Sequence, residues 1–181
     1  MTIEKTIIDD LLIIHPTVFE DERGYFYESY NAKQYEQHGL PTQFVQDNQS
    51  KSNKGVLRGL HFQNPPYAQG KLVRVIKGAV IDVAVDIRKS SATYGKHIAI
   101  ELNETNKTML YVPEGFAHGF VTLEDNTIFS YKCTNFYNNK EEVSLLWNDS
   151  NLAINWQESN PSLSAKDIGG ISFNLFISPF N

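Results

Sequence analysis

Residues 72–88 read Leu-Val-Arg-Val-Ile-Lys-Gly-Ala-Val-Ile-Asp-Val-Ala-Val-Asp-Ile-Arg, two runs rich in β-branched residues that are separated by Gly78. β-branched residues favour extended strands, and a glycine between two such runs is a turn signal. The second run alternates, with apolar side chains on one face and charged ones on the other: Val83, Val85 and Ile87 opposite Asp82, Asp86 and Arg88. An alternation of period two predicts β-strands.

Further runs of this kind lie on both sides of the stretch. Residues 56–63 look like a strand, and alternating or β-branched segments recur at 98–102, 108–112 and 127–133, separated by turn-rich sequence. Many short strands with turns between them are typical of a sandwich or barrel. Because no linker or repeat interrupts them, we predict a single all-β domain over residues 1–181, most simply a jelly roll.

Helical patterns are few and short. Residues 31–38 could form one helix, begun by Asn31 and ended by Gly39. Residues 164–167 resemble a capping box that opens a second helix, which the following pair of glycines would end. The apolar end of the chain, 171–181, is expected to pack on the body or on a partner subunit.

Composition and charge exclude several classes of protein. The chain is 41% hydrophobic and 20% charged, with a formal net charge of -5, so no global basic field favours nucleic acid. A single cysteine, Cys133, cannot form an intrachain disulfide, which agrees with a cytoplasmic location. No apolar run approaches the roughly 20 residues of a membrane helix, and the N-terminus lacks a signal-peptide pattern. We therefore expect a cytoplasmic protein that acts on neither nucleic acid nor membranes.

The stretch most informative about function is 56–63, Val-Leu-Arg-Gly-Leu-His-Phe-Gln, which holds Arg58 and His61. Lys71 follows a short loop later, and His118 comes just after a Pro-x-Gly turn. Histidine ordinarily titrates near neutral pH and so can carry protons, while neighbouring cations can hold a phosphate or an enolate oxygen. The pattern predicts proton transfer on an anionic substrate that carries a carbonyl group.

The histidines do not form a metal-binding pattern. Jelly rolls of the cupin type often bind a metal through a His-x-His pair, a nearby acid and a later histidine. His118 matches the later histidine, but Phe62 and Gln63 follow His61, and no acid lies at suitable spacing. A catalytic metal usually has three protein ligands, so we predict that the chain binds no metal.

With these residues assembled, the chain closely resembles the dTDP-4-dehydrorhamnose 3,5-epimerases, a metal-independent branch of the cupins. The motifs that carry the likeness lie at 19–24, 44–48, 56–63, 69–74, 82–88, 112–121, 131–137 and 163–167. The resemblance implies a cupin-type jelly roll (double-stranded β-helix) that forms a homodimer by exchanging N-terminal strands. It also implies a nucleotide-sugar substrate, dTDP-4-dehydro-6-deoxy-D-glucose, inverted at C3 and C5 to dTDP-4-dehydro-L-rhamnose on the route to dTDP-L-rhamnose and surface polysaccharide.

Carbons 3 and 5 of this sugar flank the C4 ketone, so inversion through an enolate needs a base, an acid on the opposite face and a cation for the oxygen. No redox cofactor is required, and the chain has no dinucleotide-binding fingerprint. By resemblance, His61 is the base and Asp167 the carboxylate that orients it. Lys71 is the cation and Tyr131 the acid. Each has a structural alternative: a core histidine, a capping carboxylate, a surface lysine and a core tyrosine.

The resemblance also implies a set of substrate-binding residues. Arg58 and Arg23 would bind the diphosphate, because a guanidinium fits phosphate oxygens, although surface ion pairing is an alternative for both. Arg23 would come from the exchanged segment and reach the neighbouring subunit. Tyr25 and Glu28 match nucleobase contacts, and the family often has phenylalanine in place of Tyr25, which leaves the base preference open. The remaining candidates are polar pocket residues and sugar contacts: Gln46, Asn48, His118, Tyr137 and Lys166. For His118 a structural role in its turn is the alternative.

Two other functions stay open at this level. One is inversion at C3 alone, or of a different nucleotide-linked 4-keto sugar, because pocket shape decides the stereochemical outcome. The other is a noncatalytic sugar-binding cupin. Binding alone does not require an acid and a base on opposite faces, so the joint presence of His61, Lys71, Tyr131 and Asp167 favours an enzyme.

Overall fold

The two runs within 72–88 form strands that belong to different sheets of a computed structural model, which describes all residues from 1 to 181. Strand β7 (Lys71–Lys77) lies in a six-stranded sheet and β8 (Ala79–Asp86) in a five-stranded one. Gly78 joins them with φ +79, and a Cβ at this position would lie 2.4 Å from Oγ1 of Thr127. Only glycine makes this corner without strain or collision.

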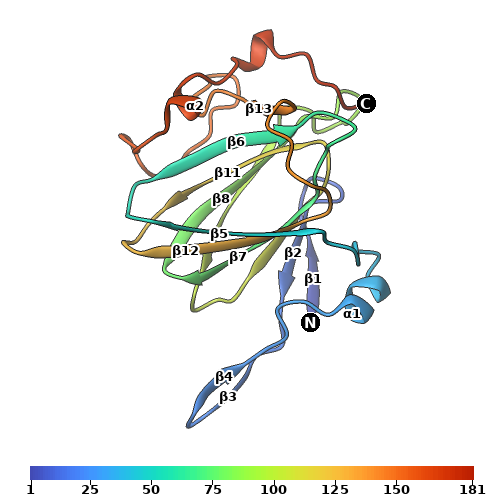
Figure 1. Ribbon diagram of the computed structural model, residues 1–181, viewed down its shortest axis with the longest axis vertical. Helices are drawn as coiled ribbons and strands as arrows, with labels where there is room; N and C mark the ends of the chain where they lie inside the picture. The colour runs from blue at the N-terminus through green and yellow to red at the C-terminus, as the bar shows by residue number, and fades with distance from the viewer.

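The two antiparallel sheets face each other as a jelly roll (Figure 1), which confirms the predicted fold. The six-stranded sheet has, in order, β1 (Thr2–Lys5), β2 (Leu12–His15), β10 (Met109–Val112), β7, β12 (Thr127–Cys133) and β5 (Gln46–Ser52). The five-stranded sheet has β13 (Glu142–Ser144), β6 (Leu57–Gln63), β11 (Phe116–Thr122), β8 and β9 (His97–Asn103). Every strand expected from the sequence is present, with ends displaced by one or two residues.

The core between the sheets is built from the inward faces of both. Val73, Val75 and Phe129 from the six-stranded sheet pack with Val80 and Phe120 from the five-stranded sheet, and all are buried. Burying a side chain of this size contributes about 1.5–3 kcal/mol, so this layer joins the two sheets strongly. Tyr131 packs against its edge, half-buried.

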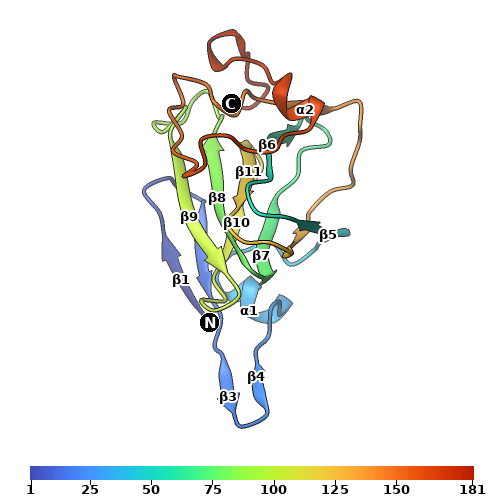
Figure 2. The same cartoon turned by 90° about the vertical axis from the view of Figure 1, so that its left-hand side faces the viewer.

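Both faces of β8 are buried, although four of its eight residues are alanine or aspartate. Val83 and Val85 belong to a second apolar cluster on the outer face of the five-stranded sheet. The C-terminal part of the chain covers this face, with Trp156 buried and Phe173, Phe176 and Phe180 packed beside it (Figures 1 and 2). The expectation that the C-terminal segment packs on the body is therefore confirmed.

The helices match the sequence patterns. Helix α1 (Ala32–Gln37) is capped by Asn31, whose side chain accepts from the amides of Lys33 and Gln34. Helix α2 (Ala165–Ile168) has the full capping box between Ser164 and Asp167. A single 3₁₀ turn, η1 (Phe173–Leu175), follows near the C-terminus. None of these helices has the length and apolar character needed to span a membrane.

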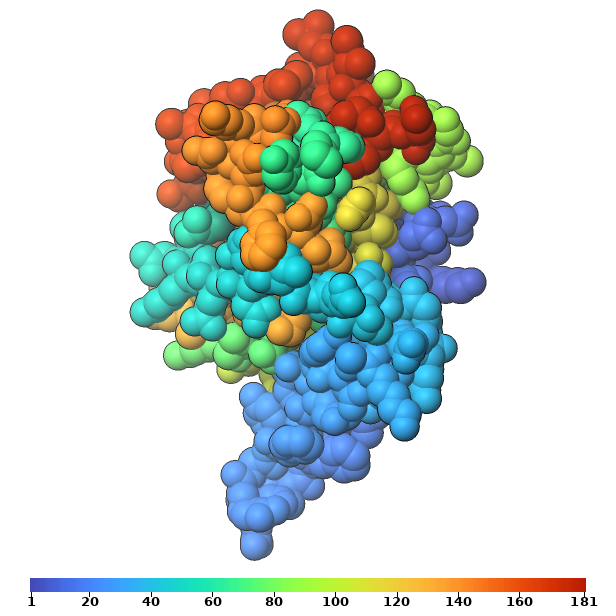
Figure 3. All heavy atoms as spheres, turned by 45° about the vertical axis from the view of Figure 1, so that its right-hand side comes forward, coloured from blue at the N-terminus to red at the C-terminus, as the bar shows by residue number.

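A two-stranded hairpin, β3 (Phe19–Asp21) and β4 (Gly24–Phe26), projects from the body (Figures 1 and 3). Its large side chains are exposed: Phe19 is 63% exposed and Phe26 67%. Isolated two-stranded hairpins are marginally stable in water, so a projecting hairpin with exposed aromatic residues is typical of a segment that contacts another surface.

Candidate active site

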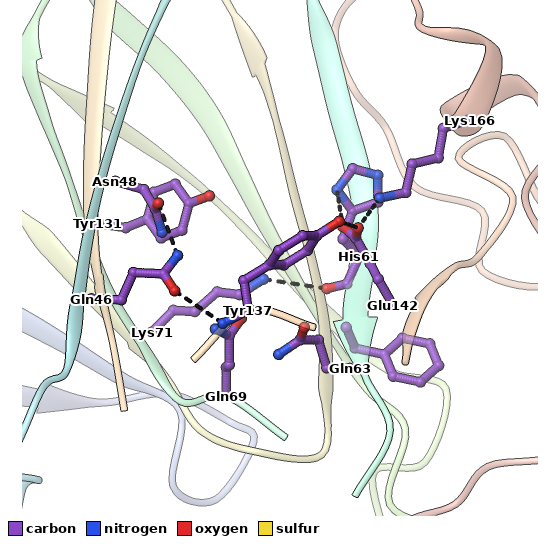
Figure 4. Close-up of a pocket in the computed structure, with 11 residues that line it drawn as sticks. Gln46, Asn48, His61, Gln63, Gln69, Lys71, Tyr131, Tyr137, Glu142 and Lys166 are labelled. Carbon is purple, nitrogen blue, oxygen red and sulfur yellow. Dashed lines mark hydrogen bonds and ion pairs between the residues drawn. The ribbon is translucent and has the colours of Figure 1, made fainter. Parts of the chain in front are cut away.

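A cavity of about 390 Å³ opens between the two sheets, beside their shared core. A second hollow of about 350 Å³ adjoins it and shares His61, Lys71 and Tyr131. His61 lies on β6 of the five-stranded sheet, whereas Lys71 and Tyr131 lie on β7 and β12 of the six-stranded sheet. Their side chains therefore enter one space from opposite walls (Figure 4).

His61 is held by the carboxylate of Asp167 in α2. Nε2 of His61 lies 2.7 Å from Oδ1 of Asp167, which also accepts from the amide of Gly59 at 3.2 Å. The second oxygen accepts from the amide and the hydroxyl of Ser164. Burial opposes ionisation of Asp167, but these hydrogen bonds, that of His61 first, lower its pKa to about 2.

This geometry decides which nitrogen of His61 faces the cavity. Asp167 is ionised above about pH 2 and can only accept, so Nε2 must carry a hydrogen. In the neutral imidazole Nδ1 is then left with a free lone pair. That nitrogen faces Glu142 at 3.9 Å, on the open side of the ring. The arrangement presents a base toward the cavity and a fixed carboxylate behind it.

Strands β6 and β11 approach each other closely at Gly59, whose amide donates to Asp167 of α2. Gly59 has φ +143, and a Cβ there would lie 2.5 Å from Cα of Gly119 on β11. The register between the two strands shifts at this point, between His118 and Phe120. Two facing glycines thus let the strands touch and direct the Gly59 amide to the carboxylate that holds His61.

Tyr131 and Lys71 have shifted pKa values with a common cause. Burial raises the pKa of Tyr131 to about 12, and nearby Cys133 and Glu142 act in the same direction. The phenol therefore stays protonated at neutral pH and can donate. Burial lowers the pKa of Lys71, whose Nζ extends to the carbonyl oxygen of His61 at 3.5 Å. An ammonium in a poorly hydrated site interacts strongly with negative charge that develops nearby.

Several predicted binding residues line the same cavities. Arg58 lines the larger one and donates to Oγ of Ser52 at 3.3 Å, while Lys166 of α2 lines both and forms an ion pair with Glu142. Gln46 and Asn48 come from β5 and are joined to each other at 3.0 Å. The site therefore holds cations locally, as an anionic ligand requires of a chain with net charge -5. The remaining predicted member, Tyr137, lies on the loop after β12 and is half-exposed.

His118 lines the larger cavity from β11 but is almost fully buried. Its Nε2 lies 3.0 Å from both oxygens of Asp82 on β8, and its ring stacks near Phe129. Asp82 is completely buried, so this pair is mutually satisfied inside the protein. The structure thus places His118 in the cavity wall and pairs it with Asp82 on a neighbouring strand, and its contact with the sugar stays a prediction.

Three predicted residues lie outside the cavity of their own subunit. Arg23 is in the projecting hairpin and pairs with Asp21, and Tyr25 in the same hairpin is 56% exposed. Glu28 accepts from Asn31 at 3.0 Å, near the start of α1. None of the three lines the two hollows around His61. Within one chain they do not join the site.

Sequence reasoning missed two acids, Glu142 and Asp82, and two amides, Gln63 and Gln69, at the site. Glu142 borders the smaller hollow, where it touches Tyr137 and Lys166, and Asp82 holds His118. Gln63 lies beside Glu142 on the neighbouring strand and accepts from the amide of Asn138 at 2.6 Å. Strand β13 carries no motif of its own, so only its pairing with β6 could have identified Glu142.

No group of three His, Cys, Asp or Glu side chains converges in a way that could hold a metal ion. The pairs His61–Asp167 and His118–Asp82 each supply two such groups, fewer than the three protein ligands usual in a catalytic metal site. The absence of a metal remains a prediction that a chelation experiment can test.

Comparison with known proteins gives a consistent result. A family model described as dTDP-4-dehydrorhamnose 3,5-epimerase matches residues 5–174. The chain is 56% identical to the dTDP-4-dehydrorhamnose 3,5-epimerase of Shigella flexneri over 174 residues, 96% of each chain.

Solved structures show the same likeness. The dTDP-6-deoxy-D-glucose-3,5-epimerase of Legionella pneumophila, in complex with dTDP-4-keto-L-rhamnose, has a TM-score of 0.93 and 48% identity, and the match covers 97% of this chain and 94% of that one. A 3'-monoepimerase of Streptomyces bikiniensis in complex with dTDP-quinovose has a TM-score of 0.89 but only 28% identity, over 93% and 86% of the two chains.

Proposed function

This chain belongs to the dTDP-4-dehydrorhamnose 3,5-epimerase family, and from that premise we propose how its side chains divide the reaction. The enzyme is an isomerase that inverts C3 and C5 of dTDP-4-dehydro-6-deoxy-D-glucose, a step of dTDP-rhamnose biosynthesis. The observation that carries the assignment of roles is the position of His61 and Tyr131 on opposite sheets, facing one cavity.

His61 is the base in this proposal. Its Nδ1 removes a proton from the carbon beside the C4 ketone, while Asp167 holds the ring and stabilises the imidazolium that forms. Lys71 lies in the same cavity and stabilises the negative charge on the enolate oxygen. Tyr131 then returns a proton to the same carbon from the opposite face, which inverts its configuration. Because C3 and C5 both flank the ketone, one set of groups can serve both carbons.

The nucleotide part of the substrate is held by the cations and amides around this centre. Arg58 and Lys166 bind the diphosphate, since both line the cavity and carry charge toward it. Gln46, Asn48 and Tyr137 form the polar wall of the smaller hollow. His118, fixed by Asp82, contacts the sugar.

Arg23, Tyr25 and Glu28 act across a homodimer. The hairpin that carries Arg23 and Tyr25 projects away from the body, exposes its aromatic side chains and does not reach its own cavity (Figure 1). Exchange of this N-terminal segment would place Arg23 at the diphosphate, and Tyr25 and Glu28 at the base, of the neighbouring subunit's site. The cytoplasm is the proposed location, because a nucleotide-sugar substrate and the free thiol of Cys133 both suit it.

Deuterium exchange tests the function and the role of the base together. The purified protein is incubated with dTDP-4-dehydro-6-deoxy-D-glucose in deuterated water, and C3 and C5 are followed by NMR. We expect deuterium at both carbons in the wild type and at neither in His61→Ala. His97→Ala, the same substitution on β9 outside the cavity, is the matched control.

The pattern of exchange separates the candidate functions. Deuterium at one carbon only in the wild type would indicate a monoepimerase, as in the Streptomyces bikiniensis relative. Exchange at neither carbon would indicate a binding protein. Wild-type exchange in His61→Ala would remove His61 from the mechanism.

A further inference from the structure

Glu142 connects three site residues at the mouth of the cavity (Figure 4). One of its oxygens accepts from the Tyr137 hydroxyl at 2.5 Å and from the Lys166 ammonium, and the other lies 3.9 Å from Nδ1 of His61. The side chain of Glu142 is 14% exposed, whereas that of Lys166 is 44% exposed. Glu142 therefore lies between Nδ1 of His61, whose side chain is half-buried at 24% exposure, and two residues that reach solvent, Lys166 and Tyr137.

Double inversion creates a problem that this position can solve, and the reasoning here rests on the function proposed above. After one inversion His61 holds the proton taken from carbon, and Tyr131 has given its proton away. Neither group is then ready for the second carbon. Before the second inversion, one proton must leave His61 and another must return to Tyr131, while the sugar stays bound.

The proton has no useful exit through Asp167. That carboxylate is 2% exposed, and its oxygens already accept from Gly59, Ser164 and His61. The other route runs from Nδ1, which faces the cavity where the sugar would bind, and the carboxylate next to Nδ1 is that of Glu142.

We propose that Glu142 takes the proton from Nδ1 of His61 between the two inversions and releases it to solvent. The N–H bond at Nδ1 breaks, an O–H bond forms on Glu142, and the imidazole returns to its neutral form. The carboxylic acid then loses its proton to water, and Tyr131 regains one from water, so charge and protons balance. The gap of 3.9 Å is closed by a small side-chain movement or by one bridging water.

The surroundings of Glu142 keep it ready to accept. Burial opposes its ionisation, but Lys166 and Tyr137 outweigh burial and lower its pKa. It is therefore an anion at neutral pH before His61 becomes charged. From the facing sheet, Lys71 and Tyr131 line the same hollow. A proton accepted by a group of low pKa passes rapidly to water, as a relay requires.

Glu142→Gln tests the relay, because the amide can still accept from Tyr137 and Lys166 but cannot take up a proton. With the exchange assay above, we expect the first inversion to proceed once per site while singly inverted sugar accumulates. Formation of doubly inverted sugar should fall by roughly a hundredfold, the lower end of what a positioned proton-transfer group contributes. Added imidazole buffer should restore the second inversion, because a soluble base can replace the missing carboxylate. Glu142→Asp, which keeps a carboxylate, should retain more of the second inversion than Glu142→Gln.

Glu141→Gln is the matched control, since this neighbouring side chain contacts Asn64 rather than the site. It should behave as the wild type, without a response to imidazole. Wild-type double inversion in Glu142→Gln would overturn the relay, and so would an equal loss at both carbons that imidazole does not relieve. Failure of the wild type itself to exchange deuterium would instead contradict the proposed function.

Discussion

At the scale of single residues, the two nitrogens of His61 have different surroundings. Nε2 donates to Asp167, and Nδ1 faces the cavity. The carboxylate of Asp167 stays ionised because four hydrogen bonds converge on its two oxygens. Asp167 closes the capping box of α2 and also sets the tautomer of His61. The capping and catalytic interpretations of Asp167 are therefore compatible.

The low pKa of Asp167 predicts how Asp167→Asn changes stability with pH. The folded-state pKa is lowered from 3.8 to about 2, so the ionised carboxylate stabilises the fold above pH 3.8, and this contribution is lost as the pH falls through about 2. We expect Asp167→Asn to lower the free energy of unfolding by about 2 kcal/mol near neutral pH. The difference from the wild type should shrink in acid.

Urea unfolding of both proteins, at neutral pH and at about pH 3, measures this difference. If the difference in the free energy of unfolding between the wild type and Asp167→Asn stayed the same in acid, the ionised carboxylate would not be the origin of that difference. Asp125→Asn, in an exposed turn, is a control that should not show the same trend.

At the scale of elements, the contact of β6 with β11 depends on glycine. Gly59→Ala would place a Cβ 2.5 Å from the backbone of Gly119, with φ in a region that side chains rarely adopt. We expect a loss of at least about 2 kcal/mol in stability and a larger loss of activity, because the Gly59 amide would move away from Asp167.

Gly169→Ala is the matched substitution for that test. Gly169 ends α2 with φ -84, and the nearest atom to a new Cβ is 3.4 Å away. Alanine there should be neutral or slightly stabilising, because it restricts the unfolded chain. Thermal unfolding of the two variants should therefore give opposite results, and equal melting temperatures would contradict the steric account.

At the scale of the whole molecule, the projecting hairpin predicts a site shared between subunits. Arg23→Ala and His61→Ala chains are co-expressed, so that about half of the dimers are mixed. In a mixed dimer one site combines an intact His61 with the partner's intact Arg23, and the other site lacks both. Although each variant alone should be nearly inactive, the mixture should recover about a quarter of wild-type activity, which an epimerase assay measures. Absence of recovery would place Arg23 in the site of its own subunit.

Metal removal is a second prediction for the molecule as a whole. The cavity offers an imidazole, an ammonium and a phenol for the chemistry, and no three metal-ligating groups converge. Treatment with a strong chelator should therefore leave the rate of epimerisation unchanged. Loss of activity that a divalent cation restores would show that a metal takes part.

The amino-acid sequence by itself determined the class of fold and supplied the candidates for most of the proposed reacting groups. Period-two alternation and β-branched runs predicted six of the strands (β6, β7, β8, β9, β10 and β12), and caps at Asn31 and Ser164 predicted both helices, because these signals act over only a few residues. The motifs around His61 and Tyr131 indicated an acid and a base, and all four predicted catalytic side chains line or border one cavity.

Sheet membership, strand pairing and burial depend on contacts between distant segments, and only the tertiary structure decided them. The strands β7 and β8 are adjacent in sequence yet belong to different sheets, because Gly78 turns the chain where Thr127 leaves no room for a side chain. Pairing of β13 with β6 brought Glu142 to the mouth of the site, and burial between the sheets raised the pKa of Tyr131. Register, burial and electrostatics arise from residues far apart in the chain, and no local pattern encodes them.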